Sequence, residues 1–249
     1  MYIVAIANQK GGVTKTSTAV SLTAALARAE KRTLMVDLDP QSSLTEYFTD
    51  PAELDQTNFG LIVDGIEIKP LALGYYIGLL PTNIDLAAAE VLLPSKPNFE
   101  RRLARYLRPY ADRYDYCLID CPPSLGVLTR NALTAATTVL IPVATELMAS
   151  RTIPLIMSQI EEVRDSELNP ALDIWAILTT LYNSREKEDN DTLTEIREKY
   201  GQLVYAHPVP RRTNYKKAVR QRVDISDIDP EMGKFWDNLA GQLIQRKEK

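Results

Sequence analysis

Short apolar runs alternate along the chain with longer stretches in which apolar positions recur at helical spacing. Several of the short runs are apolar on both faces, which is typical of parallel strands covered by helices on each side. We predict strands at residues 2–7, 33–38, 76–80, 116–119, 138–143, 174–179 and 203–206. We predict helices at residues 15–29, 84–93, 99–111, 125–136, 154–165, 191–200 and 232–249. The alternation indicates an α/β fold, with a doubly wound, mostly parallel sheet, helices on both faces and ligands at the carboxyl ends of the strands.

Two stretches depart from this alternation. Residues 50–70 lack a clear period and are predicted to form an irregular excursion, whereas residues 185–191 are highly charged and are predicted to form a solvated loop. A length of 249 residues suits one α/β domain with a large core. We therefore expect a single domain, with no further domain before the first strand.

The composition is that of an ordinary globular protein, with 45% apolar and 25% charged residues. A net charge of −4 argues against a uniformly basic nucleic-acid binder, so any DNA contact would come from a local patch. The two cysteines, Cys117 and Cys121, suit a reducing cytosol and are better explained as buried strand residues than as a disulfide or a zinc site. Neither a signal peptide nor an apolar run of about 18 residues is present, so we expect a cytoplasmic protein.

A glycine-rich stretch, Lys-Gly-Gly-Val-Thr-Lys-Thr at residues 10–16, lies between the first predicted strand and the first predicted helix. The backbone N–H groups of such a turn, with the positive end of the helix dipole, form a phosphate cradle. In this cradle Lys15 would reach the β- and γ-phosphates, and the Thr16 hydroxyl would ligate Mg²⁺. Gln9 and Thr14 stand where a generic P-loop has glycine, and Lys10 adds a second lysine. Normal nucleotide binding would require Thr14 to keep an ordinary dihedral region, because a β-branched residue tolerates φ > 0 poorly.

Carboxylates follow two of the predicted strands. Asp37 and Asp39 lie two residues apart at the end of the second strand, so they share one face. In a phosphate site with Mg²⁺ such acids hold metal-bound water or orient the attacking water, although acids that only cap a loop would give the same pattern. Asp120 ends another apolar run, directly before Cys121 and a Pro-Pro pair, as in a Walker B element whose carboxylate supports Mg²⁺ through water.

Three motifs, in this order, resemble those of the ParA/MinD family of deviant-Walker ATPases. They are the loop at residues 10–16, Val-Asp-Leu-Asp-Pro-Gln at residues 36–41 and Leu-Ile-Asp-Cys-Pro-Pro-Ser at residues 118–124. The resemblance is closest to the ParA branch, which includes plasmid and chromosome partition proteins and McdA-like carboxysome-positioning proteins, and it covers roughly the whole chain. It implies a single P-loop ATPase domain over residues 1–249, without an additional N-terminal DNA-binding domain, that uses ATP and Mg²⁺.

The resemblance also implies roles for individual residues. Lys10 matches the signature lysine, which in the family crosses an ATP-sandwiched dimer to the nucleotide of the other subunit and acts like an arginine finger. Lys15 matches the Walker lysine and Asp39 the acid that positions the attacking water, so Lys10, Lys15 and Asp39 are the predicted catalytic residues. Thr16, Asp37 and Asp120 are the predicted magnesium residues. The predicted nucleotide-binding residues are Gly11, Gly12, Val13, Thr14, Lys15, Thr16, Ser17 and Pro210.

Residues 211–222 form a cluster of six basic residues without an acid, in a chain that is acidic overall. The cluster resembles, in its position, the surface with which ParA dimers bind DNA without sequence preference. The alternative is a solvated basic face balanced by the acids of residues 224–231. A second set of arginines at residues 101–108 fits a solvent-facing helix better than a DNA footprint. The predicted DNA-binding residues are Arg211, Arg212, Lys216, Lys217, Arg220 and Arg222.

The last predicted helix, residues 232–249, carries an apolar stripe. We predict that it docks on the core and is not the membrane-binding tail of a MinD-like relative, so no stable membrane binding is expected. His207, the only histidine, is predicted to end a strand and to have no catalytic role.

The resemblance implies a cytoplasmic, nucleoid-associated ATPase that forms a homodimer with ATP sandwiched between the subunits and binds non-specific DNA. A cargo-linked activator protein, ParB-like or McdB-like, would stimulate hydrolysis, and the cargo would be a plasmid, a chromosome or a protein organelle. Three rivals stay open: a MinD-type membrane-cycling regulator, a metabolic ATP-dependent enzyme on the same fold, and an iron–sulfur reductase relative. Cys117 and Cys121 do not match the cluster cysteines of the last of these.

Overall fold

The computed structural model describes residues 1–146 and 149–248, without the side chains of residues 149 and 150. Within these residues the chain forms a seven-stranded sheet in the order β3-β4-β2-β5-β1-β6-β7. All neighbouring strands are parallel except β3 and β4, so the predicted mostly parallel sheet is confirmed. The strands are β1 (Tyr2–Ile6), β2 (Thr33–Asp37), β3 (Leu71–Ala72), β4 (Ile77–Leu80), β5 (Tyr116–Asp120), β6 (Thr138–Ala144) and β7 (Asp173–Thr180).

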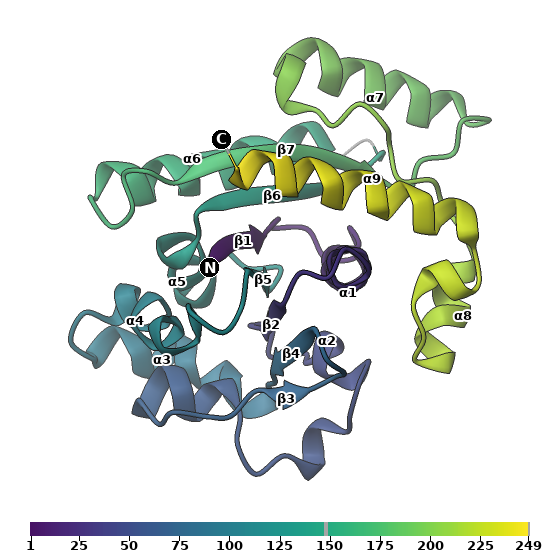
Figure 1. Ribbon diagram of the computed structural model, residues 1–249. Coiled ribbons are helices and arrows are strands. Elements are labelled where there is room, and N and C mark those ends of the chain that lie inside the picture. The colour runs from purple at the N-terminus through teal and green to yellow at the C-terminus, as the bar shows by residue number, and fades with distance from the viewer. Residues whose placement is uncertain (147–148, 249) are drawn as a thin grey trace.

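Helices cover both faces of this sheet, and short 3-10 turns extend several of them. Figure 1 shows α8 and α4 at opposite sides of the molecule, with the sheet between them. The α-helices are α1 (Lys15–Arg28), α2 (Ser43–Glu46), α3 (Ala89–Leu92), α4 (Arg102–Leu107), α5 (Val127–Ala135), α6 (Ala149–Asp165), α7 (Lys187–Tyr200), α8 (Asn214–Gln221) and α9 (Pro230–Lys247).

The alternation of side chains along each central strand divides the core into two layers. On β1, Val4 and Ile6 pack into one cluster with residues of α1 and α9, whereas Ala5 packs into the other with residues of α4, α5 and α6. Successive side chains of a strand point to opposite faces, so a strand with helices on both faces has to be apolar throughout. This explains why the central strands are continuous hydrophobic runs in the sequence.

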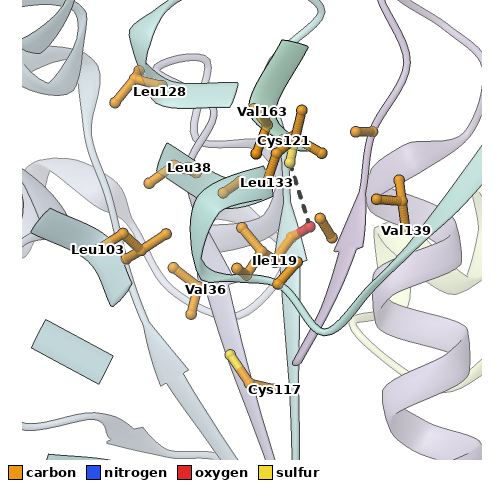
Figure 2. Packing of buried hydrophobic residues seen from close by; sticks show 14 of the residues in the cluster. Val36, Leu38, Leu103, Cys117, Ile119, Cys121, Leu128, Leu133, Val139 and Val163 are labelled. Carbon is orange, nitrogen blue, oxygen red and sulfur yellow. Dashed lines mark hydrogen bonds between the residues drawn. The ribbon is translucent and has the colours of Figure 1, made fainter. Parts of the chain in front are cut away.

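Both cysteines are buried, as predicted, and lie in the packed layer that contains Ala5. Figure 2 shows Cys117 and Cys121 among Val36, Ile119 and Leu133, and neither thiol is exposed to solvent. Burial raises the pKa of both thiols, so they are neutral core residues at physiological pH.

The predicted strand at residues 203–206 is wrong. Residues Gly201–Leu203 form a 3-10 turn, and only Val204 makes a bridge, an isolated parallel one with Ile177 of β7. Pro208 and Pro210 follow closely, and proline cannot donate to a strand ladder, so this edge cannot extend into a regular strand. The seventh strand is instead β3, a two-residue antiparallel pair with β4 that lies just after the irregular region.

Several helix boundaries also differ from the prediction. The helix α7 begins at Lys187, so most of the predicted charged loop at residues 185–191 is its first turn, where Glu188 and Asp189 suit the positive end of the helix dipole. The helix α6 begins before Pro154 and continues through it. Residues 50–70 are irregular, as predicted, but include a turn of π-helix at Gly60–Asp64 whose apolar residues are buried.

Candidate nucleotide-binding active site

The glycine-rich loop joins the carboxyl end of β1 to the first turn of α1, at the centre of the sheet. Gly12 (φ 75°) and Thr14 (φ 69°) both adopt the left-handed conformation. Such turns direct successive backbone N–H groups into a concave anion site, which the start of a helix reinforces. Lys15 is 7% exposed, and its Nζ donates to the Lys10 carbonyl at 3.2 Å, so the ammonium group curls back over the loop. Burial lowers the pKa of Lys15, although Asp120 and other neighbouring groups oppose the shift.

The expected ordinary dihedral of Thr14 is wrong, because its φ of 69° and ψ of 27° are left-handed. Its surroundings hold it there from both sides. The Thr14 carbonyl accepts from the Thr18 amide at 2.8 Å to start α1, and the carbonyl before it, that of Val13, accepts from the Thr180 hydroxyl at 3.2 Å. The Thr14 hydroxyl is buried and has no hydrogen-bond partner within the described residues. A β-branched residue in this region stores strain that the rest of the loop must offset.

Thr16 and Asp120 form a corner that fits magnesium. The Thr16 hydroxyl donates to Asp120 Oδ2 at 2.6 Å, while the other oxygen of this carboxylate, Oδ1, is buried without a partner in the described part of the chain. Burial and the nearby Asp37 together raise the pKa of Asp120 to about 8, although the Thr16 hydroxyl and Lys15 oppose the shift. A hydroxyl beside an unpaired carboxylate oxygen is the donor set that a hydrated Mg²⁺ requires, and the cation would favour the ionised acid.

Asp37 lies opposite Asp120 in the register of β2 and β5 and is fully buried. Its Oδ2 accepts from the amide and the hydroxyl of Thr45, at 2.8 and 2.6 Å, and its Oδ1 accepts from the Asp39 amide at 3.2 Å. Burial raises the pKa of Asp37 to about 7. These bonds tie the start of α2 to the end of β2; the supporting role of Asp37 in the metal's water shell stays a prediction.

Asp39 lies in a cleft of about 540 Å³ in front of the glycine-rich loop. Its Oδ1 accepts from the Gln41 amide at 2.9 Å, which closes a tight turn after the strand. Gly11, Gly12, Lys15 and Thr16 line one side of the cleft, and Asp39, Tyr47, Pro123 and Val219 line the other sides. An acid that faces bound phosphates across such a cleft is placed to orient a water molecule.

Lys10 is not among the residues that line this cleft in the described part of the chain. Its ammonium group forms an ion pair with Glu146, which follows β6, and its side chain is 28% exposed. Lys15 therefore lines the cleft, whereas Lys10 is held outside its lining by Glu146.

A second pocket, of about 400 Å³, adjoins the phosphate cleft and shares Thr14 and Ser17 with it. Its other walls come from three separate segments and include Leu181, Val209, Pro210, Tyr215 and Trp236. The predicted Pro210 is placed here by a bridge with Tyr182. The resemblance also pointed to the runs that contain Leu181 and Val209 as regions near the base, whereas Tyr215 and Trp236 were not found, since single residues on distant segments carry no local signal. The largely apolar slot beside a phosphate site suits a flat, partly apolar base.

The basic cluster is carried by α8, a helix that was not predicted. Arg211 forms an ion pair with Glu186 at 3.8 Å, and Arg212 forms one with Glu231 at 2.6 Å. The other four side chains are exposed and form no ion pair with any residue that the structure describes; they are Lys216, Lys217, Arg220 and Arg222. Two of the six basic side chains are therefore balanced by ion pairs, and the positive charge of the other four is not balanced by an ion pair within the described residues.

In the second set of arginines, Arg101 and Arg102 bind backbone carbonyl groups of other segments. Arg101 donates to the carbonyls of Leu168 and Glu167, at 3.1 and 2.7 Å, and Arg102 donates to those of Ile62 and Val63. These bonds join α4 to two distant loops, which favours the structural interpretation over a DNA footprint.

The helix α9 packs on the core, as predicted. Trp236, Leu239 and Leu243 are buried and share a cluster with Leu22 and Leu26 of α1. Its apolar stripe is therefore occupied within the chain. None of the helices in the described ranges is both long and apolar enough to cross a membrane.

A P-loop at the centre of a parallel sheet, a Thr–Asp magnesium corner and an adjoining base pocket define a nucleoside-triphosphate-binding protein. Residues 1–174 match the family described as AAA domain. The chain is 40% identical to the chromosome partitioning protein ParA of Myxococcus xanthus over 98% of its length and 88% of that protein. It is 37% identical to the sporulation initiation inhibitor protein Soj of Bacillus subtilis over 92% of its length and 91% of that protein. The chain thus belongs to the ParA/Soj family of the AAA-domain proteins; it is an ATPase, and ATP and Mg²⁺ are its ligands.

The fold is also that of a solved protein from Mycobacterium smegmatis, described as cobyrinic acid a,c-diamide synthase, with bound ADP and magnesium or a bound ATP analogue and magnesium. The two chains are 34% identical and superpose with a TM-score of 0.87 over 100% of this chain and 96% of the other.

Proposed function

We propose that this ATPase is a partition protein that dimerises on ATP, binds DNA as the dimer without sequence preference, and releases it on hydrolysis. A cargo-bound partner would stimulate hydrolysis and so convert the cycle into movement or spacing of the cargo. The observation that carries the proposal is the position of α8. Its cations Lys216, Lys217 and Arg220, with Arg222 directly after it, are exposed, while Val219 of the same helix lines the phosphate cleft and Lys216 also lines the adjoining pocket. One helix thus has a surface for DNA phosphates and a surface at the nucleotide.

The dimer is supported by the two lysines of the loop. Lys15 lies in its own cleft, whereas Lys10 sits on the rim in an exchangeable surface ion pair with Glu146. A rim lysine that leaves such a pair can bring positive charge to a nucleotide held by a second subunit, where it would stabilise the charge that develops on the transferred phosphoryl group.

Within each subunit, Asp39 would orient the attacking water, while Thr16 and Asp120 would hold Mg²⁺, which neutralises charge on the β- and γ-phosphates when bound. The described residues of the cleft include no histidine, and the buried acids Asp37 and Asp120 are held by Thr45 and Thr16. We therefore expect slow hydrolysis until a partner completes the site.

Replacing Asp39 by Ala tests the cycle, because it should remove water positioning and leave the phosphate loop intact. The variant should form an ATP-dependent dimer in analytical ultracentrifugation and should retard DNA in a gel at low salt. A variant that stays monomeric with ATP would contradict the sandwich. Lys10→Ala tests the contact between subunits, since dimerisation and hydrolysis equal to those of the wild type would remove Lys10 from the mechanism.

A second candidate is a metabolic ATP-dependent enzyme, favoured by the description of the solved protein from Mycobacterium smegmatis, which is 34% identical. Such an enzyme would couple ATP turnover to a small carboxylate acceptor, and its turnover would not respond to DNA. Steady-state ATPase rates, measured with and without DNA and with and without candidate acceptors, distinguish the two. A rate that responds only to an acceptor would replace the partition proposal.

A further inference from the structure

The helix α8 is a wall of the nucleotide site as well as a carrier of positive charge. Val219 lines the phosphate cleft, and Tyr215 and Lys216 line the adjoining base pocket. On the inner side Ala218 is only 2% exposed and lies beside Ser17 and Ser21 of α1. A displacement of α8 would therefore change the shape of the cleft. Conversely, a change in the shape of the cleft would change the position of the exposed cations.

One hydrogen bond joins the end of this helix to the loop that carries Asp39. The Tyr47 hydroxyl donates to the Val223 carbonyl at 2.6 Å. Tyr47 directly follows α2, whose Thr45 is held by the buried Asp37, and Tyr47 and Asp39 both line the phosphate cleft. The bond thus connects a wall residue of the cleft with the segment just beyond α8.

Both the donor and the acceptor of this hydrogen bond are held in place. Tyr47 is 8% exposed, and burial raises the pKa of its phenol, so the hydroxyl stays protonated and donates. Arg222 adopts a left-handed conformation (φ 53°) that ends α8, and the Val223 amide then bonds back to the Ala218 carbonyl at 3.2 Å. The accepting carbonyl is therefore fixed relative to the helix and lies one residue from Arg222, one of the four free cations.

The other anchors of α8 come from different parts of the molecule. Trp236 Nε1 of α9 donates to the Tyr215 hydroxyl at 2.8 Å, and Arg28 of α1 pairs with Asp224, which follows Val223. Among the hydrogen bonds and ion pairs of the residues that the structure describes, the bond from Tyr47 is the one that joins this region to the segment after α2.

We propose that Tyr47 is a positioning residue that links the nucleotide state of the cleft to the DNA affinity of α8. The inference rests on the proposed function, because it requires that α8 bind DNA in a nucleotide-dependent way. Bound phosphates would fix the conformation of the segment that contains Asp39 and Tyr47. Through Tyr47 this segment would hold α8 in the orientation in which its cations contact DNA together. By linkage, DNA bound to α8 would raise the affinity for ATP by the same factor by which ATP raises the affinity for DNA.

Tyr47→Phe tests this link, because it removes the hydroxyl and keeps the packed ring. The measurement is the dissociation constant of a labelled DNA duplex, by fluorescence anisotropy at one salt concentration, with a non-hydrolysable ATP analogue and again with ADP. The ratio of the two constants is the coupling. Loss of one neutral hydrogen bond should reduce this ratio by about three- to tenfold. A variant that is only less stable would weaken DNA binding in both nucleotide states and leave the ratio unchanged.

Tyr110→Phe is a matched control. The Tyr110 hydroxyl also donates to a backbone carbonyl, that of Ile68, at 2.6 Å, and the residue is buried far along the chain from α8. It should lose a similar amount of stability and keep the wild-type ratio.

The outcomes separate the two proposals. If the wild type binds DNA equally with both nucleotides, the proposed function fails, and the inference fails with it. If the wild type shows the coupling and Tyr47→Phe retains the full ratio, the role of Tyr47 is overturned and the proposed function stands. An equal loss of coupling in Tyr110→Phe would also overturn it, since the effect would then belong to general stability.

Discussion

Thr14→Gly should make the unliganded protein more stable, although it changes a residue of the phosphate loop. Thr14 is held at φ 69° and ψ 27°, where an L-residue with a Cβ is strained by about 1–2 kcal/mol. Glycine avoids this strain but loses about 0.5–1 kcal/mol through the greater freedom of its unfolded chain. The two terms leave a net gain of about 0.5–1 kcal/mol.

The side chain of Thr14 adds a second contribution. Its hydroxyl is buried without a partner within the described residues, and relief of such a group is worth about 1–3 kcal/mol. Loss of the methyl group offsets about 0.8 kcal/mol of this. The expected sum is a stabilisation of about 1–3 kcal/mol, or about 2–12 °C in melting temperature for a domain of this size.

Urea unfolding and thermal melting of the protein without nucleotide measure the effect. Gly12→Ala is the matched control, because Gly12 has φ 75° and an added Cβ would meet no atom within 4 Å. Its stability should fall by about 1 kcal/mol, from backbone strain alone. If Thr14→Gly is neutral or destabilising while Gly12→Ala behaves as expected, the strain assigned to Thr14 is refuted.

Three further predictions concern charge and buried polar groups. Because burial raises the pKa of Asp37 to about 7, the folded protein binds a proton that the unfolded chain releases near pH 4. Stability without ligand should therefore fall between about pH 4 and pH 7, and Asp37→Asn should reduce this dependence in urea titrations between about pH 5 and pH 7. The buried Asp120, with a pKa raised to about 8, contributes a slope of the same sign that should remain in the variant; an unchanged slope would assign the whole dependence to another group. Replacing Lys216 and Lys217 together by Ala should lower the slope of log affinity for DNA against log salt concentration by about 1–2, whereas an unchanged slope would place the DNA elsewhere. Asn58→Ala should cost about 2–3 kcal/mol in chemical unfolding, because Asn58 Nδ2 joins the carbonyls of Asp37 and Leu80 at 2.7 and 2.9 Å; a loss under 1 kcal/mol would contradict this bridge.

The central strands and the phosphate loop could be predicted because their signals are local. A strand buried on both faces is apolar at every position, and a turn that must expose N–H groups needs glycine. The helix α8 could not be predicted in this way. Its eight residues are mostly polar, and the contacts that hold it come from Trp236 and Tyr47, which are distant in the sequence. A short helix depends on tertiary packing more than on its own propensity.

The contacts within the site also divide into those that local motifs predict and those that depend on the tertiary fold. Thr16 and Asp120 were both predicted as magnesium residues from their motifs, and they meet because both motifs end at the carboxyl edge of the sheet. The partners of Asp37 did not follow, since Thr45 is recruited by the way that α2 folds back on β2. The conformation of Thr14 was missed because residue preference was given more weight than the hydrogen bonds on both sides of it.

These features together indicate that the unliganded site is held in an unfavourable state that ATP and Mg²⁺ relieve. Lys15 is buried with a lowered pKa, Asp120 is buried with a raised pKa and an unpaired oxygen, and Thr14 is strained. Phosphate would supply the counter-charge for Lys15, and the cation would supply it for Asp120, so the costs of burying the two groups fall in the complex. Part of the binding free energy of the nucleotide is therefore spent on stabilising the fold around the cleft, including the Asp39 loop and α8. Because Val219 and Lys216 of α8 line the two pockets, a bound nucleotide would act on this basic helix directly as well as through the fold around the cleft.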